Sequence, residues 1–126
     1  MNDPIALGKH EVDMSVYAKV AAHETLRQGG IVRMNTGFSE KLGMSRVPGV
    51  ATRLEDDGSL QIDISVVVQY GADLRALGPA IQEAVLSGIR RMSDQPVGQI
   101  NVYIADIEFP EGEQKFLPKG TREAAS

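Results

Sequence analysis

The sequence predicts one small α+β domain of order α-β-β-α-β, with two helices packed on one face of a three-stranded sheet. Two apolar-polar alternations, in "LQIDISVVVQYG" and "VGQINVYIADIEF", are typical of strands covered on one side. Between them, residues 73–92 repeat apolar side chains at spacings of three and four, which indicates an amphipathic helix. A length of 126 residues fits a single domain.

The ordered domain is expected to span residues 13–109, after an irregular arm at 1–12 and before a mobile charged tail at 110–126. Asp13 is the predicted N-cap of the first helix, which Gly29 and Gly30 end. Its expected apolar face holds Val12, Val16 and Val20.

Residues 31–45 mix polarity around two glycines, which predicts a loop with a short helical turn near Ser39–Leu42. Phe38 in this loop is expected to plug the core. Asp57-Gly58 predicts a tight two-residue turn of a hairpin between strands near 50–54 and 60–69.

In the long helix, Pro79 favours a proper start at that residue, with a looser turn before it. Gly88 lies on the predicted inward side, where its missing side chain would let the helix approach the sheet closely.

Composition excludes several classes of function. The net charge of -4 argues against nucleic-acid binding, and the absence of cysteine excludes disulfides and thiol chemistry. No apolar run approaches the roughly 20 residues that a bilayer span needs, and the first residues lack a secretory signal. A cytoplasmic protein is therefore expected.

No catalytic, cofactor or metal site is predicted. His10, Glu11 and Asp13 supply too few converging ligands for a metal ion, and His23 faces no partner acid in sequence. Arg90 and Arg91 form a basic pair near the end of the long helix, where the helix dipole already favours cations.

An apolar patch on the sheet predicts either a protein-interaction surface or a face that the N-terminal arm or the C-terminal tail covers. The strand at 60–69 becomes apolar on both sides, and the last strand changes parity near Asp106. Either a bulge lies there or the outer face turns apolar. In the second case the sheet face away from the helices gathers Val67, Tyr103, Ile107 and Phe109, which suits self-association.

Four segments resemble the alkaline shock protein family of bacterial envelope-stress domains: "VDMSVYAKVA", "LQIDISVVVQYGADL", "AIQEAVLSGIRRMSD" and "VGQINVYIADIEF". The similarity covers about Val12 to Phe109, while residues 31–45 follow the family only loosely. The resemblance implies a non-enzymatic cytoplasmic scaffold or adaptor of envelope homeostasis. Such a protein would form a homo-oligomer and dock to a protein partner, either membrane-anchored or an enzyme, and reach the membrane only through it.

Two alternatives remain open. One is a small-molecule-binding regulator of a partner enzyme, with a pocket between the first helix and residues 31–45. The other, less favoured, is an RNA-binding module of the strand-helix-strand kind, for which the sequence offers Tyr103 as the one suitably placed aromatic residue.

Overall fold

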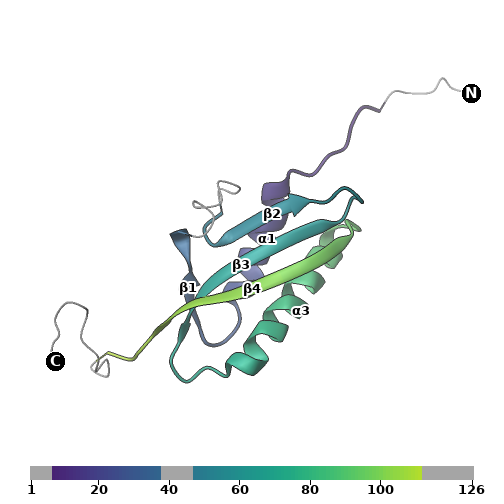
Figure 1. The fold of residues 1–126 in the computed structure, drawn as a ribbon. Helices are drawn as coiled ribbons and strands as arrows, with labels where there is room; N and C mark the ends of the chain where they lie inside the picture. Colours follow the sequence, from purple (N-terminus) through teal and green to yellow (C-terminus); the bar gives the residue numbers. More distant parts are fainter. Residues whose placement is uncertain (1–6, 38–46, 112–126) are drawn as a thin grey trace, which may run out of the picture.

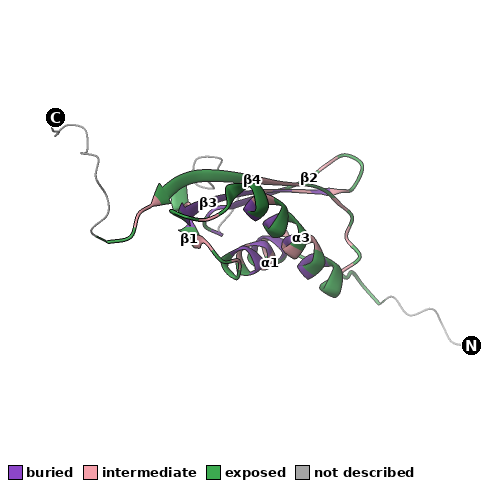
Figure 2. Ribbon diagram, turned by 90° about the horizontal axis from the view of Figure 1, so that it is seen from below, coloured by how far each residue is buried: buried purple, intermediate pink, exposed green. Residues whose placement is uncertain are grey.

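The computed structural model describes residues 7–37 and 47–111, which form an α+β domain (Figure 1). Both helices lie on one face of the sheet, as predicted (Figure 2). The element order is α-β-β-β-α-β. The helices are α1 (Met14–Leu26) and α3 (Leu74–Met92), and the strands are β1 (Ile31–Met34), β2 (Val50–Leu54), β3 (Leu60–Gln69) and β4 (Val97–Glu108).

The sheet has four strands, so the prediction of three was wrong. The additional strand is β1, which lies in the segment expected to be a loop. Its four residues are too few to show a period of two. The helical turn predicted at Ser39–Leu42 and the plug predicted at Phe38 lie outside the described residues, as does most of the predicted tail.

Strand β3 is the centre of the sheet. It pairs in parallel with β4 along its whole length, from Leu60 to Gln69. Its other edge is shared by two antiparallel neighbours, β2 beside Leu60–Ile64 and β1 beside Val66–Val68. The two meet at Ser65, whose carbonyl accepts from the Asn35 amide at 2.9 Å and whose amide donates to the Gly49 carbonyl at 2.9 Å.

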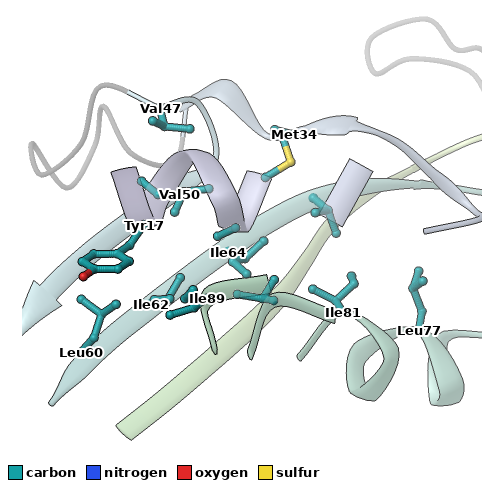
Figure 3. Close-up of a cluster of buried hydrophobic side chains, with 14 of the residues drawn as sticks. Tyr17, Met34, Val47, Val50, Leu60, Ile62, Ile64, Leu77, Ile81 and Ile89 are labelled. Atoms are coloured by element: carbon teal, nitrogen blue, oxygen red, sulfur yellow. The ribbon is translucent and has the colours of Figure 1, made fainter. Parts of the chain in front are cut away.

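The core lies between β3 and the two helices (Figure 3). The strand contributes every second residue from Leu60 to Val68, and α3 contributes its inward stripe, as the two periodicities predict. These fully buried side chains include Ile62, Ile64, Val66, Ile81, Val85 and Ile89.

Helix α1 buries a different face from the predicted one. The N-cap prediction is confirmed, since the Asp13 carboxylate accepts from the Ser15 amide at 3.0 Å. Val12 and Val16, however, are exposed, and Val20 is half-buried. The buried stripe is instead Tyr17, Ala18, Ala21, Glu24 and Thr25. Two of these residues are alanines, and both are fully buried.

Helix α3 begins at Leu74, with Asp73 as its N-cap, so Pro79 lies inside the helix and does not start it. Gly88 permits a close approach, but to α1 and not to the sheet as predicted. A Cβ at this position would lie 2.9 Å from Cγ of Glu24 and 3.1 Å from Cγ1 of Val20. The glycine therefore lets α3 pack directly against these side chains of α1.

The β2–β3 hairpin is present, but its connection is longer than the predicted two residues. Leu54 pairs with Leu60, which leaves residues 55–59 in the turn. The Gly58 amide donates to the Glu55 carbonyl at 2.9 Å, and Gly58 has φ +88°. A turn closed by a left-handed glycine is a common form of longer hairpin loop.

The same turn lowers the pKa of Asp57. The Ser59 hydroxyl donates to the Asp57 carboxylate at 2.7 Å and the Ser59 amide does so at 2.9 Å, and both bonds favour the charged form. The charged Asp57 therefore stabilises the fold fully above its unfolded-state pKa, and this stabilisation is lost as pH falls through its lower folded-state pKa.

We expect Ser59→Ala to raise the pKa of Asp57 toward its ordinary value in a carboxyl NMR titration. An unchanged titration would contradict this assignment.

Candidate interaction surface on strand β4

The four residues predicted to form one surface do not lie together. Tyr103 pairs with Ser65 on the sheet face away from the helices and is 49% exposed. Val67 shares that face but is only 3% exposed. It is therefore not available to a partner.

A β-bulge separates the other two predicted residues from Tyr103. Ile104 lies opposite Val66 and Asp106 opposite Val67, so Ala105 is an extra residue in β4. Ile107 then lies opposite Val68 on the helix side of the sheet, where it is 37% exposed. Of the two alternatives predicted near Asp106, the structure has the bulge.

Phe109 follows the end of β4 and is half-buried. Its ring stacks on that of Tyr70, with 4.9 Å between the ring centroids. Phe109 thus joins the turn after β3 and does not extend the Tyr103 surface.

An ion pair crosses the outer face beside Val67. Arg33 of β1 bonds to Glu108 of β4, and these strands flank β3 on opposite edges. Arg33 pairs with Val67 in the ladder, so the bridge passes over this part of β3. The outer face is therefore polar at the end where the sequence predicted an apolar patch.

The other end of the outer face is also polar. Asp63 accepts from Asn101 at 2.8 Å and from Gln61 at 3.4 Å, and Gln61 in turn accepts from Arg53 at 3.0 Å. These hydrogen bonds link the outward side chains of β2, β3 and β4. Tyr103 thus lies between two polar regions of the face.

Strand β4 is an edge strand within the described part of the chain, since β3 is its one strand partner there. Figure 2 shows most of its length coloured as exposed. Tyr103 on one face and Ile104 and Ile107 on the other are at least 37% exposed. We define the β4 surface as Tyr103, Ile104, Ile107 and the backbone edge of β4 that faces away from β3.

A groove runs between α3 and the first half of β4, with a volume of about 850 Å³. On its floor, the Gln82 side chain donates to the Ile100 carbonyl at 3.0 Å. Sequence reasoning missed this groove, although the small side chains on this flank of α3 were a signal. Its helix lining is Ala76, Pro79, Ala80, Gln82, Glu83 and Leu86.

The basic pair of α3 is partly structural. Arg91 donates to the buried Glu24 carboxylate at 3.2 Å, and Arg27 lies 3.6 Å from its other oxygen. Arg90 is exposed. The pocket predicted beside residues 31–45 falls partly outside the described residues.

Metal-binding and membrane-spanning features can be assessed only for the described residues. Among them, no group of three or more His, Cys, Asp or Glu side chains is placed to hold a metal ion. Neither α1 nor α3 combines the length and apolarity that crossing a membrane requires.

Comparison with known proteins identifies the family. The model of the alkaline shock protein 23 family, described as having a "cell envelope-related function", matches residues 2–109. The chain belongs to this family. The resemblance to alkaline shock proteins is thereby confirmed, and the family's description relates it to the cell envelope.

Two relatives of this family member are themselves uncharacterized proteins. YqhY of Bacillus subtilis (strain 168) is 29% identical over 108 residues, which cover 82% of this chain and 79% of YqhY. Spy1535 of Streptococcus pyogenes serotype M6 is 34% identical over 59 residues, which cover 47% of this chain and 46% of Spy1535. No solved structure matches the chain.

Proposed function

We propose that this family member is a non-enzymatic scaffold or adaptor of the cell envelope, which acts by associating with itself and by docking a protein partner. The family supplies the cell-envelope relation. The β4 surface is the single observation that carries the proposed mode of action.

Exposed strand edges favour association because their backbone donors and acceptors are ready to pair with another chain. In β4 this edge is flanked by exposed apolar side chains, Tyr103 on one face and Ile104 on the other. Burial of both against a second chain would add a hydrophobic contribution to the backbone hydrogen bonds.

The charges of the domain support a structural role. Glu24 is the one buried carboxylate among the described residues, and two arginines hold it. The Arg33–Glu108 pair ties together the strands that flank β3.

Sedimentation velocity over a wide range of protein concentration tests self-association. We expect the wild-type chain to shift from monomer to a larger species as its concentration rises, by mass action. If the chain stays monomeric at every concentration, up to the highest at which it is soluble, the proposed self-association is contradicted.

The adaptor role is tested in the native host with Tyr103→Lys and with Lys19→Glu as a control, which changes a charge on exposed α1 surface. We expect Tyr103→Lys to lose both partner recovery and resistance to cell-envelope stress, because it places a charge on the β4 surface, while the control retains both. Wild-type behaviour of Tyr103→Lys, with circular dichroism showing both variants folded, would contradict the role of this surface.

A further inference from the structure

We propose that two copies of the chain pair through their β4 edges, antiparallel, about a two-fold axis at Val102, so that one sheet runs through both copies. This inference rests on the self-association proposed above and adds its surface, orientation and register.

The backbone of β4 is arranged for such pairing. In a parallel ladder, successive residues point their backbone groups alternately toward the partner strand and away from it. The Ile100 carbonyl bonds to Gln82 of α3, and so it belongs to the outward-pointing set. The alternation places Val102 and Ile104 in the same set, up to the bulge at Ala105. Three successive outward positions therefore form a regular edge.

Between the two extra residues of β4, Gly98 and Ala105, this edge lacks the features that normally prevent strand pairing. Natural edges are blunted by short length, lysine or other charges, proline or bulges. From Val97 to Ala105 the strand has no charged residue and no proline. The opposite side of the sheet is protected, since β1 and β2 have four and five residues and each carries an arginine, Arg33 and Arg53.

The occupant that fits this edge is β4 itself. An antiparallel pair centred on Val102 sets Ile100 opposite Ile104 of the second copy, and Asn101 opposite Tyr103 of the second copy. Apolar residues thus meet on the helix side, and an amide meets a phenol on the outer side. No like charges face one another between Ile100 and Ile104, so the strand is complementary to itself.

The groove beside α3 accommodates the second strand. Ile104 of the second copy would lie beside Ile100, which lines the groove together with Pro79 and Ala80. The groove volume of about 850 Å³ leaves room for an added apolar side chain. The Ile100 carbonyl can keep its bond from Gln82 while it accepts from the new strand, because a carbonyl oxygen has two lone pairs.

Disulfide trapping tests the register, and the chain contains no native cysteine to interfere. Residues directly opposite come within disulfide range, whereas the diagonal separation of about 7–8 Å exceeds it. We expect Asn101→Cys and Tyr103→Cys to form a disulfide-linked dimer when mixed, and neither to do so alone. Lys19→Cys, on the exposed surface of α1, is the control and should remain unlinked with either variant.

Charge at the edge tests the surface independently of the register. We expect Ile104→Lys to be monomeric at concentrations at which the wild type forms dimers, because lysine is a natural edge blocker. Ser87→Lys places the same charge on exposed α3 surface and should dimerise as the wild type does. Circular dichroism must show both variants folded.

The outcomes separate this inference from the proposed function. A wild-type chain that never associates overturns both. A wild type that associates, with Ile104→Lys unaffected and no mixed disulfide, overturns the β4 pairing alone and leaves self-association through another surface. Linkage of Tyr103→Cys to itself, as strong as linkage in the mixture, overturns the register at Val102.

Discussion

Replacing Gly49 with alanine is expected to lower the free energy of unfolding by about 3 kcal/mol, since left-handed backbone strain and overpacking add together. Gly49 has φ +78°, a conformation that costs a residue with a Cβ. The added Cβ would also lie 2.7 Å from Cβ of Met34 and 2.9 Å from the Ser65 carbonyl oxygen. Both contacts are shorter than van der Waals separation, and the second is with backbone.

The crowding at Gly49 follows from the sheet topology. Gly49 lies where β1 and β2 meet along one edge of β3, and its carbonyl accepts from the Ser65 amide at 2.9 Å. A shift that relieved the clash would strain this hydrogen bond and the packing of Met34. Relaxation is therefore costly, so overpacking adds to the backbone strain at this position.

Gly58→Ala is the matched control. Gly58 has a similar φ of +88°, but an added Cβ meets no atom within 4 Å. The control therefore isolates the backbone strain, about 1–2 kcal/mol. Urea unfolding followed by circular dichroism gives both values. Equal losses in the two variants would show that crowding at Gly49 contributes nothing.

The second large effect is expected for Gly88→Val, about 2–3 kcal/mol of lost stability through overpacking. The new side chain would push against Cγ of Glu24 and Cγ1 of Val20, at the point where α3 crosses α1. Glu24 cannot swing away freely because Arg91 and Arg27 hold its carboxylate. The better helix propensity of valine offsets only a few tenths of a kcal/mol.

Ser87→Val provides the control for this substitution. Ser87 is the preceding residue of α3 and is exposed. Valine there removes an exposed hydrogen bond from Arg91 at 3.3 Å, but it adds no atoms between Gly88 and the side chains of α1. We expect a change within about 0.5 kcal/mol in thermal or urea unfolding, which is usual for surface positions. A Gly88→Val variant as stable as Ser87→Val would show that the two helices separate at no cost.

The long periodic elements were predictable from sequence. Strand β3 and helix α3 show enough repeats to fix both their type and their buried face, as Ile64 and Ile81 illustrate. Asp13 was predictable as an N-cap because its role depends on the next turn alone. In each case, the decisive signal is local.

The errors arise where tertiary structure decides. Strand β1 has four residues and is a strand because β3 offers it an edge. The valines of α1 obey a helical spacing, but in the folded domain the helix buries the face that carries Ala18 and Ala21. Gly88 was expected against the sheet because sequence does not place one helix relative to another.

The positions of the candidate surface residues were predicted only in part. Tyr103 is exposed as expected, whereas one extra residue at Ala105 moves Ile107 to the other side of the sheet. The alternation of apolar and polar residues does not show whether a strand contains an extra residue, and so it does not show on which face the later residues lie. The small side chains on one flank of α3 hinted at the groove, but its size depends on the distance between α3 and β4, which the sequence pattern does not give.

Strands β1 and β2 share one edge of β3, and this arrangement limits how far an assembly can grow. Each copy has one long edge strand available for pairing, which is β4. The opposite edge of its sheet consists of two short strands, β1 and β2, with a break beside Ser65. An isologous contact through β4 uses the same patch on both molecules and so closes upon itself. Joined in this way, the molecules would stop at two, and any fibre or lattice would need a second kind of contact.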